Sequence, residues 1–273
     1  MKVQGASAVL EAPSPPAVPT DGPLLAVEGV TVRFGGVVAV DDVTMSVLPG
    51  QIRGLIGPNG AGKTTLFDSI TGVNIPTAGS IRLEGKELSG RPATWRARRG
   101  IRRTFQRQQP FGWLSVADNV LTALEWEGGG GGIAADLLAL PSRRRVEARR
   151  RRRVDEVLEL CGLVDIRDTP AGELPIARAR MVELARAVVS RPKLLLLDEP
   201  TSGIEHEEAA QLGGIIQTIR AEDRCSVLLV EHDVAFVMSQ CDRITVLNLG
   251  RVIGEGSPEE VRSNPAVRDA YLG

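Results

Sequence analysis

Several short stretches after residue 23 have the hydrophobic pattern of strands. Residues 24–34, 37–40 and 43–48 are rich in β-branched side chains, and in residues 80–88 hydrophobic residues alternate with polar ones. Alternation with a period of two is typical of strands that bury one face. We therefore predict a small antiparallel sheet, with an edge hairpin at residues 80–88. A later hairpin is predicted at residues 244–253, around an Asn-Leu-Gly turn.

Other hydrophobic runs are continuous. Residues 194–197 are all leucine, and residues 226–230 are almost entirely aliphatic. Such runs are typical of parallel strands that are buried on both faces. Residues 51–56 predict a further strand, and residues 115–190 look helical. Because strands alternate with helices after residue 50, the pattern predicts an α/β fold with a mainly parallel sheet.

Composition separates a tail from the folded part. Residues 1–23 are rich in Ala, Pro and Ser, so we expect them to be disordered or extended. The chain has 273 residues, of which 42% are hydrophobic, which is enough for a substantial core. The expected division is a tail at residues 1–23 and one folded domain at residues 24–273.

Charge and cysteine content narrow the class of protein. The formal net charge is −1, so the chain as a whole is not strongly attracted to nucleic acid or anionic lipid. Three scattered cysteines argue against a disulfide framework and for a reducing compartment. The sequence has no membrane-spanning apolar run and no signal-peptide pattern. We expect a cytoplasmic protein whose role at a membrane, if it has one, comes through a partner.

A glycine-rich segment at residues 57–64 reads Gly-Pro-Asn-Gly-Ala-Gly-Lys-Thr. It fits the phosphate-binding pattern of glycine, four residues, glycine, lysine and Ser or Thr. Glycines let several backbone N–H groups point at an anion, and the following helix presents its positive N-terminal end. Lys63 can reach the β- and γ-phosphates of a nucleotide, and the Thr64 hydroxyl can bind Mg²⁺. The strand at 51–56 and a helix at 65–70 give the loop its expected context.

Polar residues follow the predicted parallel strands. Asp198 and Glu199 end the leucine run, and His232 follows the strand at residues 226–230. Because ligands bind at the carboxyl ends of parallel strands, we expect these side chains beside the phosphate loop. Asp198 is the expected metal-binding carboxylate together with Thr64, and Glu199 can orient the attacking water. The alternatives are a helix cap or a solvated turn for the acidic pair and a structural role for His232.

Arginines and glycines form unusual runs. Arginines gather at residues 91–107, where either a solvated helix face or a contact with phosphate or a partner would explain them. A second cluster places eight arginines within residues 143–153. A nucleic-acid or membrane-surface patch is one interpretation, but nearby acidic residues and the lack of aromatic side chains favour an exposed helix. The unbroken glycines at 128–132 predict a surface loop.

These motifs together resemble the ATP-binding subunits of ABC transporters over residues 24–273. The ordered set comprises the phosphate loop, Gln106 after an arginine-rich stretch, an LSGGQ-like segment at 174–178, Asp198-Glu199-Pro200-Thr201, Ser202-Gly203-Ile204-Glu205 and His232. Within this class the chain resembles the branched-chain amino acid importer ATPases, through residues 32–36, the long insert after Gln106 and residues 264–273. The resemblance implies a P-loop NTPase cassette with a mainly parallel core sheet, an antiparallel β subdomain and a helical subdomain at about 107–190.

The resemblance also implies ATP and Mg²⁺ as cofactors and gives individual residues their roles. Phe34 would stack on the adenine, with Val40 lining the same pocket, and His232 would contact the γ-phosphate. Gln106 would touch Mg²⁺ and the attacking water and would sense the membrane partner. The remaining nucleotide contacts would come from Gly57, Pro58, Asn59, Gly60, Ala61, Gly62, Lys63, Thr64 and Thr65 and, in a partner's site, from Leu174, Ala177 and Arg178.

The resemblance further implies an assembly. Two such subunits would face head to tail, so that each ATP lies between one phosphate loop and the other subunit's LSGGQ-like segment. The expected partners are membrane-spanning permease subunits, a second ATP-binding subunit and, indirectly, a solute-binding protein, with no nucleic acid. The chain would then be peripheral on the inner face of the cell membrane.

Departures from the family pattern fall on the LSGGQ-like segment. Ala177 stands at the family's last glycine, and its methyl group disfavours positive φ close to the partner's γ-phosphate. Arg178 adds a positive charge that could partly compensate. Glu205 replaces a shorter aspartate further along. Because the chain's own phosphate loop and catalytic candidates are complete, we hypothesise a heterodimer with unequal sites.

The expected function is ATP hydrolysis that energises an importer for branched-chain amino acids or for related amino acids and amides. The alternative is a soluble ABC-type ATPase that is not linked to transport. Such proteins usually carry two cassettes or a long coiled-coil insertion, and this chain shows one cassette and no such insertion. A GTPase would need an Asn-Lys-x-Asp segment, which is absent. A small-molecule kinase would not need Gln106, the LSGGQ-like segment and His232.

Overall fold

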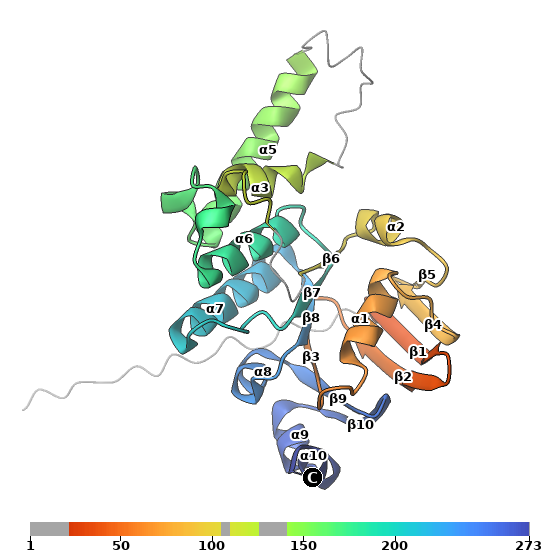
Figure 1. Cartoon of the computed structure of the whole chain (residues 1–273). Coiled ribbons are helices and arrows are strands. Elements are labelled where there is room, and N and C mark those ends of the chain that lie inside the picture. The colour runs from red at the N-terminus through yellow and green to blue at the C-terminus, as the bar shows by residue number, and fades with distance from the viewer. Residues whose placement is uncertain (1–21, 105–109, 126–140, 273) are drawn as a thin grey trace, which may run out of the picture.

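Two β-sheets form the framework of the molecule (Figure 1). The computed structural model describes residues 22–104, 110–125 and 141–272. The first sheet is antiparallel, in the order β2-β1-β4-β5. Its strands are β1 (Leu25–Phe34), β2 (Val37–Val47), β4 (Ala78–Leu83) and β5 (Lys86–Glu87). The pairing of β4 with β5 confirms the hairpin predicted for residues 80–88.

The second sheet is mainly parallel, as the continuous hydrophobic runs predict. Its order is β10-β9-β3-β8-β7-β6, and only the pair β9–β10 is antiparallel among the described strand pairs. The strands are β3 (Ile52–Ile56), β6 (Ile101–Arg103), β7 (Leu194–Asp198), β8 (Ser226–Val230), β9 (Arg243–Asn248) and β10 (Arg251–Gly256). The late hairpin is therefore confirmed.

One predicted boundary is wrong. Residues 37–40 and 43–48 are not separate strands, because β2 runs through both. Its pairing with β1 shifts register between Val40 and Val43, where Asp42 has a φ of 54°. An extra residue in one strand is a β-bulge, which bends the strand without ending it. The polar Asp41-Asp42 pair marks this bulge and not a turn between strands.

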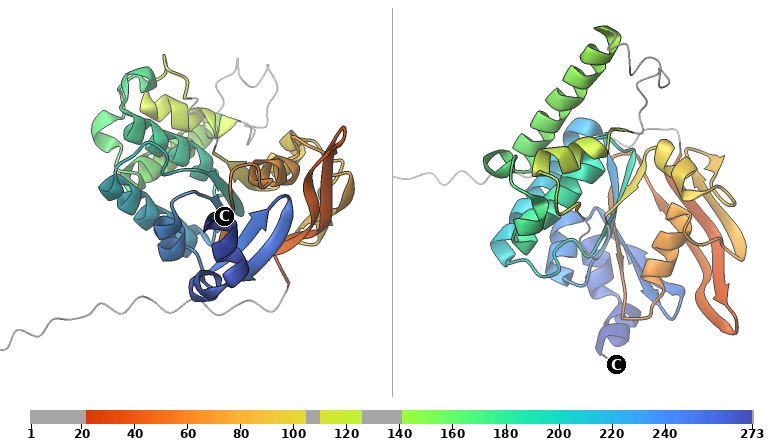
Figure 2. Two further views of the ribbon diagram at one scale, coloured as in Figure 1. Left: turned by 60° about the horizontal axis from the view of Figure 1, so that its bottom comes forward. Right: turned by 45° about the horizontal axis from the view of Figure 1, so that its top comes forward.

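Helices lie on both sides of the parallel sheet. Those along the cassette core are α1 (Lys63–Thr71), α2 (Ala93–Arg98), α7 (His206–Asp223), α8 (Val234–Gln240), α9 (Pro258–Ser263) and α10 (Pro265–Leu272). A helical group contains α3 (Val116–Thr122), α5 (Pro141–Leu160) and α6 (Ile176–Val188). Figure 2 shows this group on one side of the parallel sheet and the antiparallel sheet on the other.

The predicted helical stretch at 115–190 is interrupted. Two short 3-10 turns, Val164–Ile166 and Ala171–Glu173, lie between α5 and α6. The glycine run at 128–132 falls outside the described residues. No helix in the described part of the chain is both long and apolar enough to cross a membrane.

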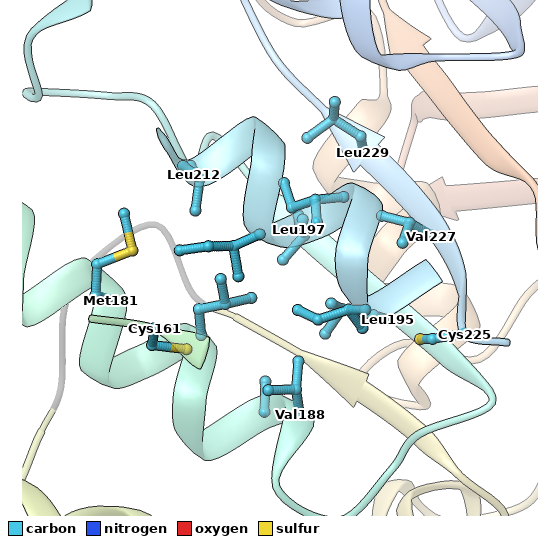
Figure 3. Packing of buried hydrophobic residues seen from close by; sticks show 14 of the residues in the cluster. Cys161, Met181, Val188, Leu195, Leu197, Leu212, Cys225, Val227 and Leu229 are labelled. Carbon is cyan, nitrogen blue, oxygen red and sulfur yellow. The ribbon is translucent and has the colours of Figure 1, made fainter. Parts of the chain in front are cut away.

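The position of the leucine strand β7 between two hydrophobic cores explains its continuous apolar sequence. Leu195 and Leu197 belong to a core on the side of the helical group, whereas Leu194 and Leu196 belong to a second core on the side of the antiparallel sheet. Successive side chains of a strand point to opposite faces, so a strand between two cores is apolar throughout. Figure 3 shows Leu195 and Leu197 packed with Val188, Val227 and Leu229 in the first core.

The three cysteines are free and buried. Burial raises the pKa of the Cys161 and Cys225 thiols to about 12. They therefore behave as small apolar side chains of the core, and no disulfide joins them.

Candidate functional site

The phosphate loop connects β3 to α1, as predicted. Gly57 has a φ of 154° and Gly62 a φ of 99°. A Cβ atom on Gly57 would lie 2.1 Å from the Leu247 carbonyl oxygen, and one on Gly62 would lie 2.4 Å from the Ala39 carbonyl oxygen. Only glycine fits at these positions. No side chain caps the N-terminus of α1, so its first N–H groups are available to an anion.

Lys63 lies across this loop. Its Nζ donates hydrogen bonds to the carbonyl oxygens of Gly57, at 2.7 Å, and Pro58, at 3.0 Å. Burial lowers the pKa of Lys63, and the charges of Glu199 and Asp198 oppose this effect. The ammonium group is thus held at the mouth of the loop, where an anionic phosphate would offset its lost hydration.

The predicted acidic pair and His232 meet beside the loop. Asp198 ends β7 and is 4% exposed, and Glu199 follows it. The Glu199 Oε1 atom lies 2.7 Å from the Nε2 atom of His232, which follows β8. Glu199 also has a φ of 48°, a strained value for a non-glycine residue that often marks functional sites. The site residues from these two strands therefore converge as expected.

Glu231 is a further residue that sequence reasoning missed. One of its carboxylate oxygens accepts hydrogen bonds from the backbone N–H and the hydroxyl of Thr201, at 2.7 and 2.6 Å. The other accepts one from the His232 N–H at 2.9 Å. Glu231 thereby connects the segment after β7 to the segment after β8 and holds Glu199 and His232 in register.

Arg103 also belongs to the site, although the sequence grouped it with the other arginines at 91–107. Its guanidinium lies 2.5 Å from an Asp68 carboxylate oxygen and 2.7 Å from an Asp198 carboxylate oxygen. It lies 5.5 Å above the Phe67 ring, and its side chain is 8% exposed. Arg103 ends β6, which pairs with β7, and no strand was predicted at these residues, so the sequence offered no signal for its place in the site. Arg103 balances the buried Asp198 charge.

The two residues predicted to contact the adenine, Phe34 and Val40, differ in exposure. Phe34, at the end of β1, is 51% exposed and is open to a stacking partner. Val40 is completely buried, and its side chain lies beneath Gly62. Val40 therefore supports the loop from below and offers no exposed surface to a base. Gln106 lies outside the described residues.

Tyr271 of α10 reaches the phosphate loop. Burial raises the pKa of its phenol, and a backbone hydrogen bond with Gly57 lowers it. This contact joins the end of the described chain to the start of the loop, and no local sequence pattern predicts it.

The LSGGQ-like segment lies at the start of α6, in the helical group. The helix N-cap is Pro175, which supplies no side-chain hydrogen bond. The Arg178 guanidinium donates to the Gly162 carbonyl and lies 3.5 Å from Asp165, so its charge is directed toward its own chain. Glu205 caps α7 through a capping box with Glu208.

Phosphate-cradling backbone, a lysine across it, and carboxylates at the ends of neighbouring parallel strands define a P-loop nucleoside triphosphatase. The family model described as "ABC transporter" matches residues 40–202, more than half of the chain. A second model, "Branched-chain amino acid ATP-binding cassette transporter", matches residues 251–273. The chain belongs to the ABC transporter family, and it is an ATP-binding, ATP-hydrolysing subunit of that family.

Known relatives match almost the whole chain. The high-affinity branched-chain amino acid transport ATP-binding proteins BraF of Pseudomonas aeruginosa and LivG of Escherichia coli are each 41% identical over 251 residues. In both cases the match covers 92% of this chain and 98% of the relative. A crystal structure of a nucleotide-free ATP-binding cassette from an ABC transporter superposes with a TM-score of 0.79 at 29% identity, covering 92% of this chain and all of that one.

Proposed function

We propose that this chain hydrolyses ATP to energise a membrane importer for branched-chain amino acids or for related amino acids and amides. The observation that supports this most strongly is the complete hydrolytic pair, Glu199 and His232 at 2.7 Å, in a chain 41% identical to branched-chain amino acid transport ATPases. The importer's selectivity would lie in its other subunits, because the site in this chain is built for a nucleotide.

Different residues of the site would bind the phosphates and activate the attacking water. The loop N–H groups and Lys63 hold the phosphates, and Glu199 accepts a proton from the attacking water. His232 fixes the Glu199 carboxylate through their hydrogen bond and would also contact the γ-phosphate.

The residues also fit Mg²⁺. Asp198 is a buried carboxylate that pairs with the guanidinium of Arg103. Thr64 is exposed at the start of α1, so its hydroxyl is accessible. With Gln106 they would form a set of oxygen ligands of the kind that Mg²⁺ prefers. Mg²⁺ would neutralise charge on the β- and γ-phosphates.

The assembly we propose contains permease subunits, a solute-binding protein and a second, different ATP-binding subunit. Ala177 and the inward-directed Arg178 support the heterodimer, because they leave the LSGGQ-like segment a weak donor to a partner's nucleotide. The chain would lie on the inner face of the membrane, held there by the permease.

Purification from detergent-solubilised membranes tests this proposal. The tagged chain should carry permease subunits and a second, non-identical ATP-binding subunit in stoichiometric amounts. A Glu259→Gln variant, altered at an exposed residue of α9, should behave identically and serves as the control. Recovery of RNA or ribosomes without membrane subunits would contradict the importer function, and recovery of a homodimer would contradict only the heterodimer.

A further inference from the structure

An arginine-lined hollow lies beside α5, away from the nucleotide site. Its volume is about 540 Å³, and it lies between α5, the end of α3 and the residues after α6. The lining side chains are Arg145, Arg149, Arg150, Arg152, Arg153, Arg191, Glu156, Leu124, Val189 and Ser190. We call this set the arginine hollow. Six arginines line it, and two of them, Arg153 and Arg191, pair with Glu156 and Asp223. The remaining four are an excess of positive charge at one place, although the net charge of the whole chain is −1.

Helical spacing brings several of these arginines to one face. Arg145, Arg149 and Arg152 are four and three residues apart, so they share one stripe of α5. All are exposed, and none forms an ion pair with another described residue. Arg151 differs, because it pairs with Glu147 at 2.9 Å and does not line the hollow. From the sequence we expected these arginines to lie on an exposed helix and to be balanced by acidic residues. That expectation fits only part of α5.

The hollow also contains polar groups that lack partners. The Nη2 atom of Arg150 and the Oγ atom of Ser190 are buried without a hydrogen-bond partner among the described residues. Buried donors are almost always satisfied in folded proteins, so such groups call for an external acceptor. Guanidinium groups bind phosphate oxygens in a forked, charge-assisted geometry.

We propose that the arginine hollow binds the phosphate groups of anionic phospholipids. This inference rests on the proposed attachment of the chain to a membrane transporter. The stripe from Arg145 to Arg152 spans about 10 Å of helix, which exceeds a single phosphate and suits neighbouring headgroups. Among the described residues that line the hollow, none is aromatic and able to stack on bases, so nucleic acid fits less well.

The position of the hollow agrees with a membrane-facing role. In Figure 1 and in the right view of Figure 2, the first turns of α5 project from the molecule at the end opposite to the C-terminal helices α9 and α10. Ala123 and Ala187 line a second groove, next to Thr104, while the nearby Leu124 and Val189 line the arginine hollow. The hollow therefore lies beside the groove that Thr104 lines, just after β6.

Vesicle cosedimentation of the full chain tests the proposal. We expect binding to vesicles of phosphatidylcholine with 30% phosphatidylglycerol (about one anionic lipid in three) to be salt-sensitive, with no binding to pure phosphatidylcholine. Each arginine near an anionic surface contributes about 1 kcal/mol, or roughly fivefold in affinity. The double variant Arg149→Gln/Arg152→Gln should therefore bind about 25-fold more weakly.

A second double variant, Arg262→Gln/Arg268→Gln, removes the same charge from exposed positions on α9 and α10 and should bind like the wild type. Equal losses in both variants, or no loss in the first, would overturn the proposal. Calorimetry with inorganic phosphate provides a second arm. Tight phosphate binding that Arg149→Gln/Arg152→Gln abolishes, without vesicle binding, would identify a soluble-anion site instead. ATP binding should be unchanged in both variants, so this test is independent of the proposed ATPase function.

Discussion

Arg103 connects parts of the site that lie far apart in the sequence. It pairs with Asp68 on α1 and with Asp198, which is 95 positions away. Asp198 is buried, so its carboxylate has lost most of its hydration. Without the Arg103 cation, the free-energy cost of that lost hydration would remain largely uncompensated. Arg103 therefore sets both the charge balance and the orientation of the expected metal-binding carboxylate.

We predict that Arg103→Met lowers the free energy of unfolding by about 3–5 kcal/mol, because it leaves a buried charge unpaired. Arg103→Lys keeps the charge but cannot fork to both carboxylates, so its loss should be intermediate. Urea denaturation measures both. Equal stability of Arg103→Met and the wild type would show that the Asp198 charge is balanced by other groups.

Sequence reasoning identified the residues of the site whose chemistry is local. The phosphate loop, Asp198 and Glu199 follow from short motifs at strand ends, and His232 follows from the end of another strand. Arg103, Glu231 and Tyr271 were missed, because their partners lie in distant segments of the chain. A one-dimensional pattern records which residues are charged or apolar, and not which of them meet.

At the scale of elements, the C-terminus of α1 depends on a buried arginine from α2. Arg96 is 1% exposed and donates to the carbonyl oxygens of Ser69 and Ile70, at 2.5 and 2.9 Å, and to that of Arg91, at 3.0 Å. The last carbonyls of a helix have no partner inside it, so Arg96 satisfies groups that would otherwise be buried and unbonded. It thereby anchors the helix that follows the phosphate loop.

We predict that Arg96→Met destabilises the protein by about 2–4 kcal/mol, because it removes charge-assisted hydrogen bonds to buried carbonyls. Arg98→Met changes an exposed arginine of the same helix and should cost less than about 0.5 kcal/mol. Thermal or urea unfolding compares the two. Similar losses would mean that Arg96 acts as an ordinary surface residue, as one interpretation of the arginine run held.

Most elements were predictable because hydrophobic spacing determines their kind. The leucine strand β7 separates two cores, so its continuous run left little ambiguity. The bulge at Asp42 was not predictable, since a polar pair within a strand and a turn between strands look alike in sequence. The sequence also does not show which of the arginines at 91–107 are buried. Arg96 is buried, whereas Arg98, two positions later in the same helix, is exposed.

For the whole molecule, we propose that the cassette carries one half of a nucleotide site and contributes only weakly to the nucleotide site of a partner subunit. The phosphate loop, the carboxylates and His232 converge at one edge of the parallel sheet. The LSGGQ-like segment lies apart from them in the helical group (Figure 1), with the Arg178 charge directed toward its own chain. This asymmetry favours pairing with a different ATP-binding subunit.

We propose that Glu199 activates the attacking water at the phosphate loop of this chain. Single-turnover hydrolysis and ATP binding should be measured together for Glu199→Gln in the complex purified with its membrane subunits. We predict ATP affinity within about twofold of the wild type and hydrolysis at this chain's site slower by about 10²–10⁴-fold, the usual contribution of a general base. Hydrolysis at that site at the wild-type rate, with ATP still bound, would show that Glu199 does not activate the attacking water.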